Sequence, residues 1–354
     1  MHMADALLSP AVGGTMWAAS SSAIAYCSAK VRKEVDERKV PLMGVLGAFL
    51  FAAQMINFSI PGTGSSGHLG GGLLLTILLG PHAAFLTVAS VLIVQALFFA
   101  DGGLLALGCN IFNLGFFPAF VAYPHIYKRI AGECPGQSRI TVAAVVAAVA
   151  GLQIGAFAVV LETVSSGVTS LPFSMFVGLM QPIHLAIGIV EGFVTAAVVS
   201  FVYKARPDIL QGPVETRPVA GFSLRNVLLA FLAAAVLTGG VVSWFASGDP
   251  DGLEWSIAKA TGTDESMGPD HGIHGILAAL QEKIAFLPGY SFKKPAEAKR
   301  ERPGAEGGAK PEGEGRKGEG SKLGTSLSGI VGGLITLVIV FLAGFLLKRR
   351  SQAA

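Results

Sequence analysis

Long apolar runs recur along almost the whole chain and limit the folds that it can adopt. Most are long enough to cross the roughly 30 Å hydrocarbon core of a bilayer as helices. A shorter run at 70–80 ends at Pro81 and favours a tight or half-length helix packed inside a bundle. Counting it, the sequence predicts about nine segments of an all-α integral membrane protein. The longer runs are 13–29, 41–60, 82–100, 110–127, 140–163, 174–203, 225–246 and 326–347.

The composition also indicates lipid as the solvent. Charged residues make up 14% of the chain, against roughly 25% in soluble domains. The net charge of +3 is small, and most basic side chains lie in short clusters between apolar runs. That pattern orients a membrane protein and does not indicate nucleic-acid binding. Three widely spaced cysteines without a C-x-x-C motif, Cys27, Cys109 and Cys134, are interpreted as packing residues.

Basic clusters alternate with loops that hold no lysine or arginine, such as 59–72, 100–110 and 162–173. Basic loops stay in the cytoplasm, and the alternation closes only if the short run at 70–80 also crosses. The N-terminus and the loop with His68 are then both extracytoplasmic, and the C-terminus is cytoplasmic. The expected location is a bacterial or archaeal plasma (inner) membrane.

The distribution of polar residues divides the chain into parts. We expect a bundle of about seven helices followed by an appendage, in which two further transmembrane helices flank an extracytoplasmic loop. One stretch of that loop holds no aromatic residue and consists mainly of Gly, Glu, Lys, Pro and Arg, so it is predicted to be a disordered tether. The expected parts are a bundle at 1–204, a cytoplasmic linker at 205–225, an appendage at 226–347 with its extracytoplasmic part at 247–292 and tether at 293–325, and a cytoplasmic tail at 348–354.

The N-terminus has the chemistry of a metal chelator. No basic residue precedes the first apolar run, so no cleaved signal peptide is expected. The amine of Met1, the deprotonated backbone nitrogen of His2 and its Nδ1 close a five-membered and a six-membered chelate ring. Such a nearly planar nitrogen set suits Ni²⁺ or Cu²⁺, and the imidazole of His68 would fill the open position. The alternative is that His2 is simply exposed and that His68 caps a helix.

Other side chains are candidates for orienting the ligands or lining the pocket. Asp5 is expected to orient His2. His184 and Glu191 are seven residues apart and share one face of a predicted helix. Ionisable groups at membrane depth are functional candidates, but a buried network that holds the bundle together is an equally good interpretation. The loop before His68 adds possible hydrogen-bond donors at Thr63, Ser65 and Ser66.

Some features weigh against other functions. The chain holds no G-x-x-x-x-G-K-[ST] motif, so it is not itself the ATPase of a pump. It also holds neither H-E-x-x-H nor G-x-S-x-G, which disfavours a membrane hydrolase. His271 and His274, three residues apart in a polar loop, are expected at the surface.

Four motifs in order resemble those of the CbiM/NikM family, the substrate-binding membrane (S or M) components of energy-coupling-factor importers for cobalt and nickel. They are "MHMADALLSP", "PGTGSSGHLGGGLL", "DGGLLALGCNIFNLG" and "HLAIGIVEGFVT", and the resemblance covers about residues 1–204. "DPDGLE" at 249–254 resembles the PDGLE domain, which plays the part of the small N component and is often fused to the M component.

The resemblance implies a ligand set made of the Met1 amine, the backbone nitrogen and imidazole of His2, and the imidazole of His68. It also implies seven helices in the M part, a separate transmembrane coupling protein (T or Q component) and a cytoplasmic ATPase (A or O component). The chain departs from the family pattern at Ala4 and Ala6, and with "GTGSSG" before His68. The implied ligands themselves, Met1, His2 and His68, are present. These changes are therefore expected to alter the rigidity of the loop before His68 and not its role.

The sequence therefore predicts a non-enzymatic capture subunit for Ni²⁺ or Co²⁺ as transported substrate, with a slight lean to nickel and no organic cofactor. A stand-alone secondary transporter or channel is the first alternative, although it would need more buried carboxylates or broken helices. A membrane metalloenzyme is the second, and it would need an open coordination position for water.

Overall fold

The computed structural model describes a predominantly helical protein with one two-stranded hairpin in its described part. The described residues are 2–34, 39–133, 135–169, 171–206, 209–210, 223–262, 272–293 and 318–352. Met1, Cys134, His271 and most of the expected linker and tether lie outside these ranges.

The bundle expected at 1–204 contains most of the described helices. A 3₁₀ turn, η1, opens it, and a π-helix, η2, lies near its middle. The elements are η1 (Asp5–Leu7), α1 (Pro10–Glu34), α2 (Lys39–Gln54), β1 (Phe58–Ile60), β2 (Ser65–Gly67), α3 (Gly72–Leu79), α4 (Pro81–Phe99), α5 (Leu107–Ile111), η2 (Phe112–Tyr127), α6 (Lys128–Ala131), α7 (Gln137–Ser166) and α8 (Phe173–Ala205).

The described C-terminal part adds two long helices and four short helical elements. Asp251 begins one short helix with a capping box: its carboxylate accepts the N–H of Glu254, and the side chain of Glu254 accepts the N–H of Asp251. The elements are α9 (Leu224–Gly240), η4 (Val242–Phe245), α10 (Gly252–Thr261), α11 (Ile273–Ile284), η5 (Pro288–Tyr290) and α12 (Gly318–Gln352).

The structure differs from the sequence predictions at three places. The run 41–60 is not a single helix, because α2 ends at Gln54 and the chain turns at Gly62 and Gly64, both at positive φ, to pair β1 with β2. Helix α10 was not expected. The part of the expected tether at 318–325 is helical and belongs to α12, while 294–317 lies outside the described residues.

The prediction of about nine membrane segments is confirmed only in its coarser form, several apolar helices. Among the described residues, four helices are long and apolar enough to span a membrane: Pro81–Phe99, Gln137–Ser166, Phe173–Ala205 and Lys322–Lys348. The helices at Lys39–Gln54 and Leu224–Gly240 are apolar but shorter. All eight residues of α3 are buried, and at 1.5 Å per residue it extends only about 12 Å. The length of α3 alone does not span the bilayer, so a crossing at this place also needs the non-helical residues 68–71 that precede it.

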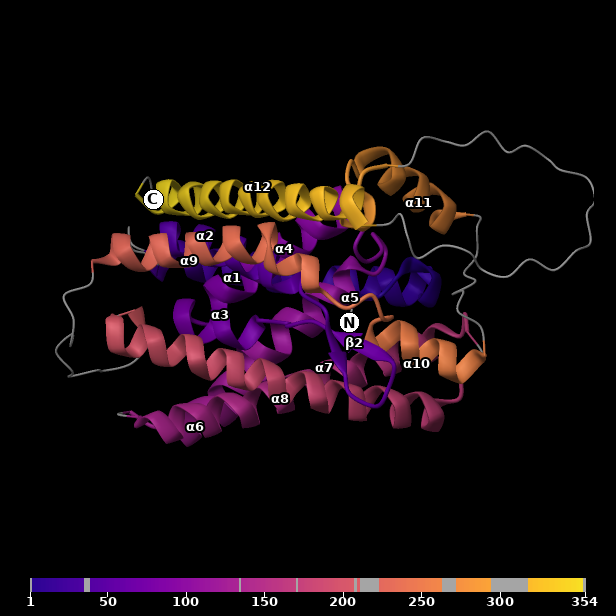
Figure 1. Ribbon diagram of the computed structural model, residues 1–354, viewed down its shortest axis with the longest axis horizontal. Coiled ribbons are helices and arrows are strands. Elements are labelled where there is room, and N and C mark those ends of the chain that lie inside the picture. The colour runs from indigo at the N-terminus through magenta and orange to yellow at the C-terminus, as the bar shows by residue number, and fades with distance from the viewer. Residues whose placement is uncertain are drawn as a thin grey trace, which may run out of the picture.

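The helices lie side by side, with α12 packed along α2 and α9, and α10 packed against α8 and β2 (Figure 1). Close crossings depend on glycine. A β-carbon at Gly188 would lie 2.8 Å from the Cα of Val149, and one at Gly192 would lie 2.4 Å from the Cα of Val145. These two glycines let α7 and α8 approach closely, as small residues do in membrane bundles.

This packing predicts that Gly192→Ala lowers the stability of the bundle. The added methyl group meets backbone and not a flexible side chain, so the helices must separate, at a cost of about 1–3 kcal/mol. Thermal unfolding of the purified chain in detergent should show a melting temperature lower by a few degrees. Gly178→Ala on the same helix is the matched control, because a β-carbon there meets nothing within 4 Å. Equal melting temperatures for the two variants would contradict the prediction.

Candidate metal site

The N-terminal arm is bound to the loop that precedes α5. The backbone N–H of Met3 donates to Oδ1 of Asn110 at 2.8 Å, and the carbonyl of Met3 accepts from Gly103 N at 2.9 Å. The carboxylate of Asp5 accepts the N–H of Ala106 at 2.9 Å. Asp5 therefore fixes the arm as a whole and makes no described hydrogen bond to His2.

His2 is held by a carboxylate that sequence reasoning did not select. Its Nδ1 lies 2.6 Å from Oδ1 of Asp101, and its side chain is 6% exposed. The hydroxyl of Tyr290 in η5 donates to the other oxygen of Asp101. Burial acts to raise the pKa of Asp101, but the neighbouring His2 and the hydrogen bonds from His2 and Tyr290 outweigh it and lower that pKa. Asp101 is therefore a permanent negative charge beside His2.

His68 lies next to His2 across the site. The two ring centroids are 4.9 Å apart, and the ring planes are tilted by 50°. Burial, followed by neighbouring positive groups that include His2, lowers the pKa of His68 to about 3. His68 is therefore a neutral imidazole at physiological pH, which is the form that binds metals. Metal–imidazole bonds are about 2.0–2.1 Å long, so rings at this separation can reach one ion.

The loop that carries His68 is fixed by Glu191. This buried carboxylate on α8 accepts the N–H of Gly70 at 2.6 Å and that of Gly71 at 3.2 Å. The carbonyl of Gly70 accepts from the side chain of Gln54 at 2.9 Å. Glu191 therefore acts in the described structure as the loop's backbone acceptor, in agreement with a buried network.

His184, the partner expected on the same face, makes a different contact. Its Nδ1 is 2.8 Å from the carbonyl of Met180, one turn earlier on α8. Its Nε2 is buried and has no hydrogen-bond partner among the described residues. His184 and Glu191 thus share a helix face but do not form a pair.

The DPDGLE segment docks on the hairpin that leads to His68. Ser66 donates its backbone N–H to the carbonyl of Pro250 at 2.8 Å and its hydroxyl to the carbonyl of Asp249 at 2.8 Å. Ser66 and Asp251 also form an isolated parallel bridge. Thr63 and Ser65, whose hydroxyls lie 2.8 Å apart, stabilise the turn of the hairpin. Among Thr63, Ser65 and Ser66, the hydrogen bonds to Asp249 and Pro250 of the appendage come from Ser66.

An open cavity of about 440 Å³ separates the bundle from the appendage, and both His2 and His68 line it. Carboxylates surround this space and make it favourable for a cation. They are Asp5, Asp101, Asp249, Asp251 and Glu254. Within the described ranges, no group of three or more His, Cys, Asp or Glu side chains is arranged to hold an ion.

Two further outcomes concern residues of the polar loop and the terminus. His274 is not a surface residue, because it is 8% exposed and its Nε2 lies 2.8 Å from the carbonyl of Leu8. His271 and Met1 lie outside the described residues. Asp101 stands in a motif that the resemblance already used, whereas nothing in the sequence pattern indicates the contact of Tyr290.

The contacts of Glu191 predict that Glu191→Ala loosens the loop of His68. Gly70 and Gly71 would then lack their acceptor in an apolar surrounding, which costs about 1–3 kcal/mol per buried donor. We expect a lower melting temperature and faster hydrogen exchange at residues 68–72, with a smaller effect for Glu191→Gln because its amide oxygen still accepts. The exposed Glu282, changed to Ala, is the control. Unchanged exchange at 68–72 in Glu191→Ala would contradict the prediction.

Comparisons with known proteins agree with this architecture. The model of a family described as the cobalt uptake substrate-specific transmembrane region matches residues 2–209, and the model of the PDGLE domain matches residues 225–349. The fused nickel transport protein NikMN of Rhodobacter capsulatus is 30% identical over 316 residues, which are 82% of this chain and 88% of that protein.

Two shorter relatives match the bundle. The cobalt transport protein CbiM of Sorangium cellulosum is 32% identical over 220 residues, which are 59% of this chain and 94% of that protein. A crystal structure of a truncated transition metal transporter is 32% identical, covers 57% of this chain and 98% of its own, and superposes with a TM-score of 0.51. The names of these three relatives describe metal transport and do not describe catalysis. The chain is therefore a multi-pass membrane protein of the CbiM/NikM family that carries a C-terminal PDGLE domain.

Proposed function

We propose that this chain is the substrate-capture membrane subunit of an importer for Ni²⁺ or Co²⁺, and that partner subunits supply the ATP hydrolysis. The observation that carries the proposal is the pair of adjacent imidazoles, His2 and His68, whose ring centroids are 4.9 Å apart. They lie beside an acidic cavity that opens between the bundle and the appendage. The nickel and cobalt transport named for the relatives supports the same substrate class.

The proposed ligand set contains four nitrogens. The amine of Met1, the backbone nitrogen and Nδ1 of His2 and the imidazole of His68 would surround the ion in one plane. Nδ1 of His2 is hydrogen-bonded to Asp101, so binding requires His2 to exchange that contact for the ion. Binding also releases the protons of the coordinating groups. Asp101 keeps its hydrogen bond from Tyr290 and stays beside the site.

The choice between the two metals leans slightly to nickel. A planar nitrogen set is a geometry that Ni²⁺ prefers, and a relative with the same fused organisation is named as a nickel transport protein. No organic cofactor enters this proposal. A closed four-nitrogen plane leaves no position for an attacking water, which argues against a membrane metalloenzyme.

The energy source and orientation form part of the same proposal. A transmembrane coupling protein (T or Q component) and a cytoplasmic ATPase (A or O component) would drive the reorientation of the bundle and the release of the ion inward. The N-terminus and the PDGLE domain would face outward in a plasma membrane, and the C-terminus inward, as the alternation of basic loops indicates. A stand-alone secondary transporter is the alternative, and metal uptake into proteoliposomes by this chain without ATP or partners would favour it.

Metal titration of the purified chain tests the ligand set. We expect one tightly bound Ni²⁺ or Co²⁺, and a loss of affinity of about 100-fold or more in His2→Ala and in His68→Ala, because each removes a coordinating imidazole. One residue added before Met1 should weaken binding in the same way, since it moves the amine out of the chelate ring. Isothermal titration with the two ions in competition gives both the affinity and the preference.

His82→Gln is the matched control, because the ring of His82 contacts Tyr26 and Phe120, and His82 is not among the residues that line the cavity of His2 and His68. It should bind metal as the unmodified chain does. Unchanged affinity in the extended chain would show that the terminal amine is not a ligand. Unchanged affinity in both histidine variants would overturn the proposed site.

The docking of the appendage on Ser66 predicts that it assists metal loading. Deleting 247–325 should lower Ni²⁺ uptake by cells that hold the complete transporter, because the hairpin before His68 loses the hydrogen bonds from Ser66 to Asp249 and Pro250. A shorter deletion, 300–313, is the control, since it removes no described contact. Equal uptake by the two deletions and the unmodified chain would contradict a role of the appendage in loading.

A further inference from the structure

The Nε2 atom of His184 lies inside the helix bundle, and no role has been assigned to it so far. The side chain is 0% exposed, and Nε2 has no hydrogen-bond partner among the described residues. A buried polar atom left without a partner costs free energy, so a native protein keeps one only for a reason. The ring is not loosely held, because its Nδ1 is 2.8 Å from the carbonyl of Met180.

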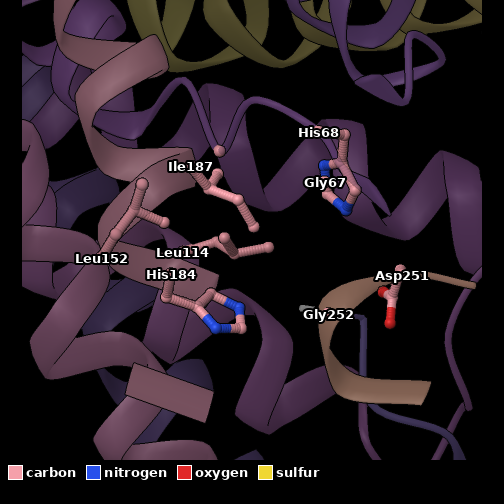
Figure 2. A pocket seen from close by; sticks show the side chains of 9 residues that line it. Gly67, His68, Leu114, Leu152, His184, Ile187, Asp251 and Gly252 are labelled. Carbon is pink, nitrogen blue, oxygen red and sulfur yellow. The ribbon is translucent and has the colours of Figure 1, made fainter. Parts of the chain in front are cut away.

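The ring projects into a second, smaller cavity of about 10 Å³ (Figure 2). His184 enters from α8, while His68 borders the cavity from the neighbouring loop. The cavity thus joins the candidate ligand His68 to a second imidazole deeper in the bundle. Its volume is about that of one water molecule or one dehydrated ion. Gly67, Ile187, Asp251 and Gly252 also line it.

The bonding of His184 is that of a histidine ready to coordinate a metal. Nδ1–H donates to a backbone carbonyl, which fixes the tautomer and leaves the lone pair on Nε2. Metal-bound histidines characteristically make this contact through their second nitrogen. Asp251 adds negative charge at the cavity, although its Oδ1 already accepts the N–H groups of Leu253 and Glu254.

We propose that His184 Nε2 and His68 form an inner transit site, which receives the transported ion from the outer ligand set. This inference rests on the proposed import of Ni²⁺ or Co²⁺. His68 is shared by both sites, so the ion changes partners by leaving His2 and the terminal amine and gaining His184. Since two imidazoles hold an ion less tightly than four nitrogens do, the inner site is weak, as a site of passage must be.

The surroundings give this transit site a direction. A third cavity, also of about 10 Å³, shares Gly70, Leu114 and Leu152 with the second one and reaches Asn113 and Glu191. It lies among α3, η2, α7 and α8. Glu191 is occupied by the N–H groups of Gly70 and Gly71, so passage beyond His184 requires the loop of His68 to move. The ion would therefore wait at His184 until the bundle rearranges.

The appendage covers the transit site. A β-carbon at Gly252 would lie 2.6 Å from Cγ2 of Ile183 and 3.4 Å from Cε1 of His184. Only glycine allows the PDGLE segment to lie this close to α8. His68 and Asp251 line both this cavity and the open acidic cavity, so an ion would reach His184 from the acidic cavity past these two side chains.

The test combines His184→Gln with His2→Ala in the full chain. His2→Ala disables the outer site and should leave a weak Co²⁺ or Ni²⁺ site with two imidazoles, countable by X-ray absorption spectroscopy. Adding His184→Gln should weaken that residual binding by about tenfold or more, as expected for a lost ligand. Adding His82→Gln instead should leave it unchanged. His184→Gln alone should keep tight binding within about threefold while lowering uptake by the complete transporter.

The outcomes separate this inference from the proposed function. If the wild-type chain binds neither ion, the proposed function is wrong and the transit site is wrong with it. If the wild type binds tightly but His2→Ala shows fewer than two imidazoles, or His184→Gln does not weaken the residual site, only the transit site is wrong. Loss of tight binding in His184→Gln, with an unchanged melting temperature, would place His184 in the outer set and also overturn the inference. His184→Asn provides the same comparison if the Gln variant does not fold.

Discussion

Backbone N–H groups inside an apolar bundle must find an acceptor, and the site depends on how this chain meets that requirement. The loop after β2 enters the bundle without helical hydrogen bonds, which is tolerated at membrane depth only where protein satisfies the backbone. Glu191 does so for Gly70 and Gly71, and Gln54 does so for the carbonyl of Gly70. These bonds fix the position of His68, two residues earlier. The placement of an imidazole is thus decided by a carboxylate that never touches it.

The imidazole of His2 is positioned by a different set of hydrogen bonds. The arm around Met3 hydrogen-bonds to Asn110 and Gly103, and His2 is held by Asp101. Asp101 is in turn held by Tyr290, which belongs to the appendage and stacks on Phe99 at a centroid distance of 5.2 Å. The two candidate ligands therefore rest on separate supports, one from α8 and one from the loop before α5. The appendage contacts the surroundings of both imidazoles. Its Asp249 and Pro250 bind Ser66, two residues before His68, and its Tyr290 binds Asp101, the partner of His2.

Much of the helical fold could be predicted from the sequence, because hydropathy is a local property. Chelate chemistry led to the expectation that His2 and His68 lie together, and their ring centroids are 4.9 Å apart, while their role as metal ligands stays a prediction. The run 41–60 was predicted wrongly because it is apolar throughout, and hydropathy does not register the turn at Gly62 and Gly64. Asp101 and Tyr290 were missed because they are 189 residues apart. The role of Ser66 was also out of reach, because it depends on a backbone contact with the distant segment 249–251. Such pairings have no periodic signal in one sequence.

The hydrogen bond between His2 and Asp101 bears on how an importer of this kind could release its cargo. A chelate of four nitrogens holds Ni²⁺ strongly, and a capture site that only binds would not turn over. Asp101 offers Nδ1 of His2 a competing partner at 2.6 Å. The neighbouring His2 and the hydrogen bonds from His2 and Tyr290 lower the pKa of Asp101 in spite of its burial and so keep it charged. In the proposed site, each ion would displace this hydrogen bond on arrival, and the bond would form again on departure. The net affinity of the proposed site for metal would then be the difference between metal coordination by His2 and the His2–Asp101 hydrogen bond. Because Tyr290 of the appendage also binds Asp101, the appendage would influence the strength of that hydrogen bond.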